Sequence, residues 1–265
     1  KKYISILLPG LIKVFRQKKV ARRMISEPQI LKNGLKFYGI QNAKNYEPNI
    51  FGHMQRLAKK YDNFVNIGAN HGFYVFSLQH LFTRIVAVEA LYENVQMIGK
   101  NVFENDLQDK VFIAPFAAFE KKEVLKFYGA ASSGSLLRGF NQQYDSGVYV
   151  QAISSDELMP SDFGKSGALY LIDVEGAEFS VLKGAEKLIG ARNSTFVVEV
   201  SCREFMPNET FTESFMAIFE LFFTCGYQAQ EIMPDGSLKT VTPEDVQHAI
   251  STNRYEGMMV IFDQK

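Results

Sequence analysis

The sequence predicts an α/β protein in which a mostly parallel sheet carries helices on both faces, and three segments support this fold class. The first, residues 63–74 (NFVNIGANHGFY), is a short apolar run that leads directly into a glycine-rich turn. The second, residues 85–88, is apolar and ends in Glu89, 21 residues after Gly68. The third, residues 169–178 (LYLIDVEGAE), is apolar up to Asp173. Continuous apolar runs are typical of buried parallel strands, and open α/β sheets bind ligands at the carboxyl ends of such strands.

The glycine-rich turn indicates what kind of ligand to expect. Gly68 allows a sharp turn where a Cβ atom would clash, and Gly72 allows the next helix to pack closely on the sheet. Asn70 replaces the second glycine of a dinucleotide fingerprint, and Asn tolerates a left-handed conformation well. The spacing Gly-x-Asn-x-Gly differs from Gly-x-Gly-x-x-Gly, which disfavours NAD. A plain turn is the alternative interpretation, but an acid about 20 residues later, here Glu89, is typical of a site for ribose hydroxyls. The pair therefore predicts a ligand that contains adenosine.

Helices and strands alternate along the rest of the chain. We expect a helix at 48–60, a strand from 63, a helix at 73–82, a strand at 84–89, a helix at 91–104, strands at 110–114 and 168–173, a helix at 177–188, a strand at 195–200, a helix at 211–225, and strands at 227–232 and 257–262. Residues 122–128 and 147–153 alternate in the manner of strands, which predicts a hairpin around a polar loop at about 130–147.

These blocks resemble the FkbM family of S-adenosylmethionine-dependent methyltransferases. The resemblance rests on NIGANHG at 66–72, VAVEA at 86–90, LIDVEGAE at 171–178 and LKGAE at 182–186. Lesser matches are Asn101, Asn105, SDEL at 155–158 and FVVEV at 196–200. The order and spacing of the blocks make the resemblance more specific than any single block. It implies a Rossmann-like seven-stranded methyltransferase sheet, S-adenosylmethionine as the cofactor, and methyl transfer as the reaction.

At 265 residues, the chain is expected to form one large domain. We divide it into an N-terminal helical extension at 1–47 and a Rossmann-like methyltransferase domain at 48–265. Residues 11–24 interleave basic and apolar side chains. One interpretation is a basic amphipathic helix that contacts an anionic membrane peripherally. The favoured interpretation is a helix that packs on its own domain or on a second subunit, which leaves a homo-oligomer open.

Composition favours a soluble enzyme of the cytoplasm. Hydrophobic residues make up 46% of the chain, enough for a core that is covered on both faces. The formal net charge is zero, so nucleic acid is a poor candidate for the acceptor. Cys202 and Cys225 form no metal-binding pattern with the four histidines, and free thiols in a reducing compartment are the simpler interpretation. No run of about 18 apolar residues is present, so we expect no membrane-spanning helix.

The resemblance also implies which residues contact the donor. These are Asn66, Gly68, Asn70 and Gly72 around the methionine part, Glu89 on the ribose, Ala117 beside the adenine, and Asp173. One departure is Asn66, where the family usually has Asp. The amide oxygen of Asn66 still accepts a hydrogen bond from an ammonium group, but it brings no charge.

Acids at the ends of two later strands are the candidates for proton removal. Asp173 and Glu199 end adjacent strands and Glu175 lies just beyond, so the three acids are expected to orient a cationic donor, to act as base, or to hold a divalent metal. His71 is a further candidate base, with covering the helix start as its alternative role. No Asp-Asn pair follows Glu199 to complete six oxygen ligands. We therefore favour metal-independent chemistry, with Asp173 and Glu199 as the candidate ligands if a metal is used.

The polar loop at about 130–147 is the candidate acceptor site. It carries hydroxyl, amide and guanidinium groups that suit a sugar, and the residues we expect to bind substrate are Ser133, Ser135, Arg138 and Asn141. The resemblance to the family points to a sugar hydroxyl of a glycan or a glycosylated metabolite as acceptor. Two other functions remain open. One is an NAD-type α/β oxidoreductase, and the other is a catalytically idle scaffold that binds S-adenosylmethionine.

Overall fold

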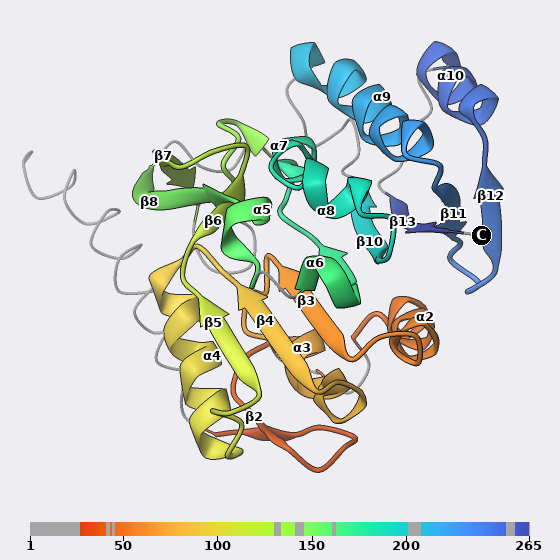
Figure 1. Cartoon of the computed structure of the whole chain (residues 1–265). Coiled ribbons are helices and arrows are strands. Elements are labelled where there is room, and N and C mark those ends of the chain that lie inside the picture. The colour runs from red at the N-terminus through yellow and green to blue at the C-terminus, as the bar shows by residue number, and fades with distance from the viewer. Residues whose placement is uncertain are drawn as a thin grey trace, which may run out of the picture.

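The computed structural model describes residues 27–40, 43, 46–129, 134–140, 146–160, 163–200, 208–252 and 258–264. At its centre is a sheet of eight strands in the order β12-β11-β13-β10-β9-β3-β4-β5 (Figure 1). The strands are β3 (Asn63–Ile67), β4 (Arg84–Val88), β5 (Val111–Ala114), β9 (Leu169–Ile172), β10 (Thr195–Val200), β11 (Gln228–Ile232), β12 (Leu238–Val241) and β13 (Met258–Asp263). The α/β class is confirmed. The expected count of seven strands is wrong, because the short and half-polar segment β12 pairs with β11 as an eighth strand at the edge.

The register of the parallel strands brings the predicted ligand-binding segments together at the carboxyl ends of three neighbouring strands. Strands β5, β4, β3, β9 and β10 run parallel, and β13, β11 and β12 pair antiparallel beyond them. Ile67 at the end of β3 lies opposite Val88 of β4 and Ile172 of β9. The glycine turn, Glu89 and Asp173 follow these three strand ends directly, so they lie together.

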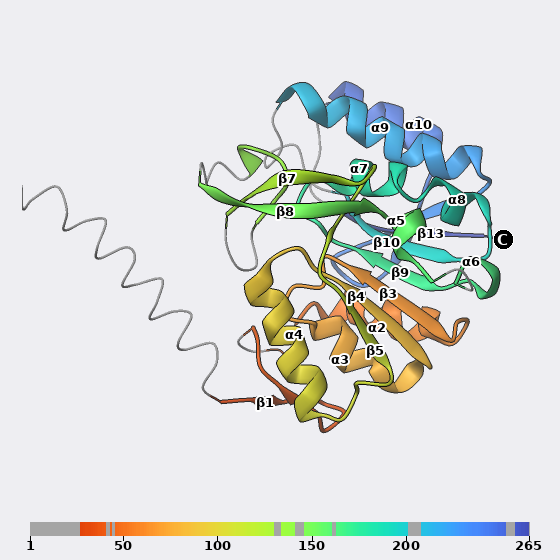
Figure 2. The same cartoon turned by 60° about the vertical axis from the view of Figure 1, so that its left-hand side comes forward.

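Two layers of helices cover the sheet (Figures 1 and 2). One layer contains α2 (Pro48–Ala58), α3 (Phe73–Leu78), the 3-10 helix η2 (Gln79–Leu81) and α4 (Tyr92–Glu104), and the other contains α7 (Glu178–Lys183), α8 (Glu186–Gly190), α9 (Asn208–Thr224) and α10 (Pro243–Thr252). Alternate residues of each strand point to opposite faces. Phe64 therefore packs with the first layer, whereas Val65 packs with the second. The sequence expectation of one helix at 177–188 is wrong, because a Cβ atom on Gly184 would lie 1.9 Å from the Phe119 carbonyl oxygen and the helix breaks at this close approach.

A second, three-stranded sheet follows β5. It consists of β6 (Ala117–Phe119), β8 (Gly147–Ser154) and β7 (Glu123–Tyr128), and two short helices follow it, α5 (Ser155–Leu158) and α6 (Phe163–Ser166). The expected hairpin is confirmed, because β7 and β8 pair antiparallel from Glu123 opposite Ala152 to Tyr128 opposite Gly147. Figure 2 shows this sheet projecting beyond α4, next to the loop that ends β4.

Residues 27–40 of the N-terminal extension are not helical, which corrects the expectation for this part of it. Two short strands, β1 (Gln29–Ile30) and β2 (Lys36–Phe37), form an antiparallel hairpin. Asn33 and Gly34 make the turn, in which Gly34 has a φ of 86° and Leu31 accepts a hydrogen bond from the Gly34 N–H. Leu31 and Phe37 pack into the same core as α2, α3 and α4. The expected basic helix at 11–24 lies outside the described residues.

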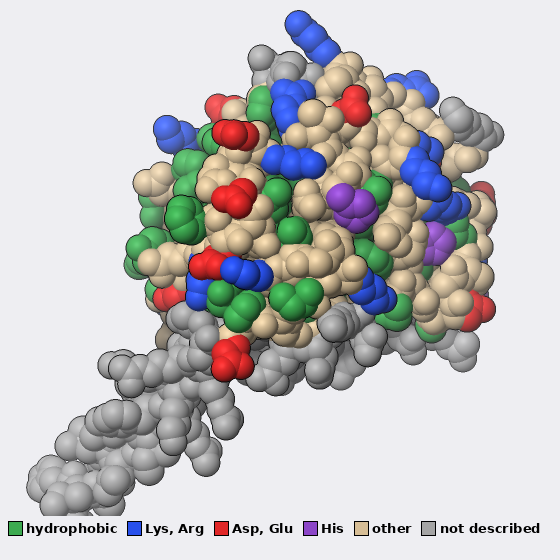
Figure 3. Space-filling view, turned by 90° about the horizontal axis from the view of Figure 1, so that it is seen from below, with side chains coloured by type: hydrophobic (Ala, Val, Ile, Leu, Met, Phe, Trp, Pro, Cys, Tyr) green, Lys and Arg blue, Asp and Glu red, His purple; other side chains and the backbone are tan. Residues whose placement is uncertain are grey.

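The surface gives little indication of a partner. Figure 3 shows basic and acidic side chains interspersed over the described part of one face, without a single broad basic area. That the chain does not bind nucleic acid therefore stays a prediction. No helix among the described residues is long and apolar enough to span a membrane.

Candidate active site

The glycine turn has the backbone conformation that the sequence predicts. Gly68, Asn70 and Gly72 have φ angles of 80°, 52° and 86°. A Cβ atom on Gly68 would lie 1.7 Å from the backbone oxygen of Asp173, so the ends of β3 and β9 approach closely only because this residue is glycine. Gly72 precedes α3, and a Cβ atom there would meet the ring of Phe76 at 2.5 Å. Both glycines are thus required by packing as well as by backbone conformation.

Glu89 connects the end of β4 to this turn. One carboxylate oxygen accepts a hydrogen bond from the Asn70 N–H at 2.7 Å, and the other accepts one from the Leu91 N–H at 2.8 Å. Burial raises the pKa of Glu89 to about 7, although these N–H groups and the Asn94 side chain oppose the rise. Asn94, in the first turn of α4, also bonds the His71 side chain. Asn94 was not among the predicted site residues, although its position five residues after Glu89 was the available signal.

The predicted acids Asp173, directly after β9, and Glu199, near the end of β10, form a hydrogen-bonded pair. The Asp173 carboxyl donates a hydrogen bond to the Glu199 carboxylate, and burial together with the Glu199 charge raises the pKa of Asp173 well above its usual range. Burial also raises the pKa of Glu199 to about 7. A carboxyl pair that shares one proton near neutral pH is able to gain or lose a proton during a reaction.

Glu175 and Glu178 take different positions after Asp173. Glu175 has a φ of 55°, an uncommon conformation for a side chain of its size, and Ser135 Oγ donates a hydrogen bond to its carbonyl oxygen at 2.6 Å. Burial and the Asp173 charge raise the pKa of Glu175 to about 7. Glu178 is 2% exposed and accepts a hydrogen bond from the Gly176 N–H at 2.9 Å. Glu178 therefore stabilises the start of α7.

A cavity of about 270 Å³ joins these parts. Eight predicted site residues line it, namely Asn66, Gly68, Asn70, His71, Glu89, Ala117, Asp173 and Glu175. Glu199 does not line the cavity itself but is hydrogen-bonded to Asp173, which does. The described lining contains three carboxyl groups and neither Lys nor Arg. Such a cavity favours a ligand that carries positive charge.

The N-terminal segment contributes residues to the site that sequence analysis missed. Tyr46 of this segment lines the cavity. Tyr74 of α3 also lines it, and Tyr74 Oη donates a hydrogen bond of 2.6 Å to the carboxylate of Glu47 in the N-terminal segment. Glu47 has a φ of 41° immediately before Pro48, where the helical regions are disfavoured. Its charge helps to raise the pKa of Asp173 and of Glu175. The left-handed conformation of Glu47 has no local sequence signal, so this position could not be predicted.

The family of the chain follows from a comparison of its sequence with family models. Residues 66–229 match the model of the methyltransferase FkbM domain. The chain belongs to the FkbM methyltransferase family. This confirms the resemblance that the sequence blocks suggested, and it makes S-adenosylmethionine the methyl donor of the family. No curated protein matches the chain.

Solved structures of other methyltransferases resemble the fold distantly. Methyltransferase FkbM from Methylobacillus flagellatus KT is 14% identical, with a TM-score of 0.46 over 77% of this chain and 44% of that one. The chain thus spans less than half of that protein. An O-methyltransferase from Bacillus cereus in complex with SAH is 14% identical, with a TM-score of 0.44 over 83% of each chain. Precorrin-6y C5,15-methyltransferase from Geobacter metallireducens GS-15 is 10% identical, with a TM-score of 0.44 over 86% of this chain and 94% of that one. Likenesses at this level carry no argument about the reaction.

The residues at the cavity suit the donor of an FkbM methyltransferase. We expect Glu89 to bond the ribose hydroxyls, Ala117 lies on the wall where the adenine is expected, and the Asp173–Glu199 pair and Glu175 offer negative charge to a sulfonium and an ammonium group. The individual roles assigned to these residues stay predictions. The same holds for His71 as a base, which the structure places beside Asn94 on the Glu89 side of the cavity.

The predicted acceptor loop is described only in part. Ser133 and Asn141 lie outside the described residues. Ser135 is 1% exposed and bonds the Glu175 carbonyl oxygen, whereas Arg138 is exposed. Gly134 and Leu136 line the same cavity as Glu89, so this part of the loop borders the donor region. Within the described residues, no group of three or more His, Cys, Asp or Glu side chains has the arrangement of a metal site, and metal independence stays a prediction.

Proposed function

We propose that this chain is an S-adenosylmethionine-dependent O-methyltransferase that acts on a sugar hydroxyl of a glycan or a glycosylated metabolite. Membership of the FkbM family supports the donor. The observation that carries the proposal is the cavity itself, where Glu89, Asp173 and Glu175 surround a space without a described Lys or Arg. This charge is complementary to a sulfonium donor, and it disfavours the diphosphate of NAD.

The carboxyl groups supply the chemistry that a hydroxyl acceptor needs. S-adenosylmethionine supplies an electrophilic methyl group and leaves as S-adenosylhomocysteine. The acceptor hydroxyl must lose its proton as its oxygen bonds the methyl carbon, and the Asp173–Glu199 pair is placed to take that proton. Tyr46 and Tyr74 line the same cavity, and aromatic side chains there suit contact with a sugar.

The test combines donor binding with product analysis. We expect S-adenosylhomocysteine to bind in calorimetry while NAD does not, and we expect label from methyl-labelled donor to enter a saccharide as an ether that survives alkaline hydrolysis. Binding of NAD alone would favour the oxidoreductase. Donor binding without turnover across a broad panel of saccharides would favour the idle scaffold. Label released by alkali would indicate a carboxyl acceptor, and loss of activity after prolonged chelation would indicate a metal.

A further inference from the structure

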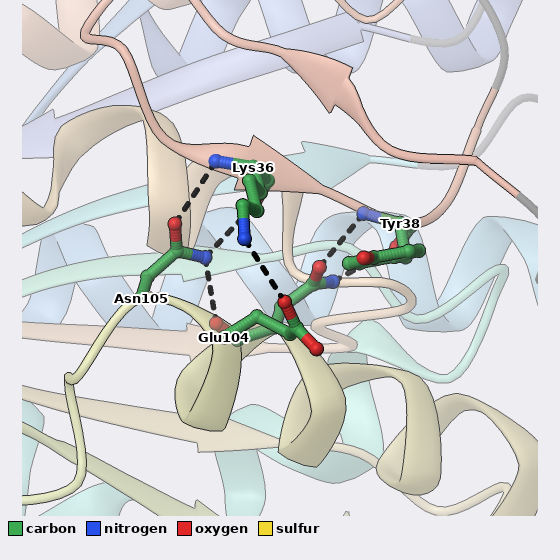
Figure 4. Close-up of polar contacts among 5 residues, drawn as sticks. Lys36, Tyr38, Glu104 and Asn105 are labelled. Carbon is green, nitrogen blue, oxygen red and sulfur yellow. Dashed lines mark hydrogen bonds and ion pairs between the residues drawn. The ribbon is translucent and has the colours of Figure 1, made fainter.

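Residues 36–40, the strap, are fastened to α4 by two asparagine side chains (Figure 4). Asn105 accepts from the Lys36 N–H at 2.9 Å and donates to the Lys36 carbonyl oxygen at 2.8 Å. Asn101 does the same for Tyr38, at 2.7 and 2.8 Å. Lys36 and Tyr38 are two residues apart, about 6.6 Å along an extended strand, and Asn101 and Asn105 are four residues apart, about 6 Å along a helix. Because these spacings match, each asparagine amide bonds the strap backbone as a neighbouring strand would.

Asn101 differs from Asn105 because it also contacts the glycine turn. Its Nδ2 lies 3.3 Å from the carbonyl oxygen of His71, and its side chain is fully buried. The strap itself packs on this turn, since a Cβ atom on Gly39 would lie 2.8 Å from the Cβ atom of His71. Asn105 lies one helical turn after Asn101, and its Nδ2 donates to the carbonyl oxygen of Asn101 at 2.7 Å instead of to the glycine turn. Asn101 thus joins the strap to the turn, whereas Asn105 only anchors the strap.

The strap leads into residues that close the cavity. Ile40 ends the strap and lines the cavity, and Tyr46 follows a few residues later on the same wall. Both precede residues 66–229, which match the family model. We propose that Asn101 is a positioning residue for donor binding, which holds the strap against the glycine turn so that the strap and the donor stabilise each other. This inference rests on the proposed function, because it assumes that the donor occupies this cavity.

Coupling between two groups is reciprocal, so the unmodified chain provides the first test. Bound S-adenosylhomocysteine must hold the strap as strongly as the strap holds the ligand. We expect saturating ligand, at about 100 times Kd, to slow amide hydrogen exchange at Tyr38 at least about tenfold, within a limit of about a hundredfold. The amide of Asp245, which bonds Thr242 Oγ1 at the start of α10, is the reference and should not change.

Two matched variants provide the second test. Asn101→Asp and Asn105→Asp each replace the NH₂ group with oxygen and keep the acceptor. We expect Asn101→Asp to raise the Kd of S-adenosylhomocysteine at least about tenfold and Asn105→Asp less than about twofold. If Asn101→Asp fails to fold, exchange at Tyr38 in the unmodified chain decides the matter.

The outcomes separate the two proposals. Ligand binding that leaves exchange at Tyr38 unchanged would overturn the role of the strap and keep the proposed function. Equal effects of the two variants on Kd would also overturn the role of Asn101. If the unmodified chain does not bind S-adenosylhomocysteine at all, the proposed function fails and the inference fails with it.

Discussion

Glu89 holds the backbone of the glycine turn at the predicted ligand site. Its two carboxylate oxygens accept hydrogen bonds from the N–H groups of Asn70 and Leu91, so the residue expected to bind ribose also fixes the glycine turn. Glutamine offers only one acceptor oxygen, and its NH₂ group would face an N–H donor. We expect Glu89→Gln to lose about 1.5–3 kcal/mol, and hence at least about tenfold in the affinity for S-adenosylhomocysteine.

Calorimetry measures this loss, with the exposed Glu93→Gln in the next helix as the matched control. Unchanged affinity in Glu89→Gln would show that the donor lies elsewhere.

Asp173 is the residue we expect to matter most for turnover. Its carboxyl group shares a hydrogen bond with Glu199 and lines the cavity, and Asp173→Asn keeps its shape while removing the titratable group. We expect kcat to fall at least about a hundredfold, the usual contribution of a placed general base. The exposed Asp109→Asn should leave kcat unchanged. Full turnover in Asp173→Asn would transfer the role to Glu175, Glu199 or His71.

At the scale of elements, the ends of β3 and β9 approach each other closely beside the cavity. A methyl group on residue 68 would overlap the Asp173 backbone oxygen, and the φ of 80° disfavours any side chain. We expect Gly68→Ala to destabilise the protein by more than about 1 kcal/mol, which lowers Tm by at least about 2–4 °C, and to weaken donor binding.

Gly190→Ala is the matched control for this change. Gly190 is the last residue of α8 and has no atom within 4 Å of an added Cβ, so alanine should be tolerated there. Thermal melting with and without S-adenosylhomocysteine compares the two variants. Equal melting temperatures would contradict the role of the close approach.

Elements with a strong local pattern could be predicted from sequence, and elements that depend on distant contacts could not. Strand β9 is a continuous apolar run and β3 is mostly apolar, and both were predicted within a residue or two. Strand β12 has polar side chains and is stabilised by pairing with β11, which no local pattern reveals. The hairpin of β1 and β2 depends on Asn101 and Asn105, which lie more than 60 residues away in the sequence.

The site shows the same division between local and distant information. Left-handed Asn70 and the acids after the strands were predicted because the chemistry of each residue and its place after a strand suffice. Tyr46 and Glu47 were not, since only the path of the N-terminal segment brings Tyr46 to the cavity and the Glu47 charge near Asp173.

Over the whole molecule, the buried acids make stability depend on pH. Burial raises the pKa of Glu89, Glu175, Glu178 and Glu199 to about 7, above the usual value near 4.5. The folded state therefore keeps protons that the unfolded state releases between about pH 4.5 and 7, and stability falls as pH rises through this window. Burial also raises the pKa of Asp173, whereas it lowers the pKa of His71, so one group opposes five.

We accordingly expect the free energy of unfolding in urea to be larger at pH 5.5 than at pH 8. Glu178→Gln should flatten this dependence, because glutamine does not titrate and the Glu178 side chain is buried at the start of α7. The exposed Glu186→Gln should leave the slope unchanged. A stability that rises steadily from pH 5.5 to 8 would contradict the raised pKa values.

The same acids should make the enzyme discriminate between its donor and its product by charge. S-adenosylmethionine carries a sulfonium and S-adenosylhomocysteine a neutral thioether, while both carry the same amino-acid group, whose titration cancels in the ratio of their Kd values. As pH rises from 6 to 8, Glu175 and Glu199 lose protons and the cavity becomes more negative. We therefore expect S-adenosylmethionine to gain affinity relative to S-adenosylhomocysteine over this range, with protons released on binding. Calorimetry in two buffers of different ionisation enthalpy measures both quantities. A ratio that stays constant from pH 6 to 8 would mean that the sulfonium does not lie near these carboxylates, and that the acids serve the acceptor instead.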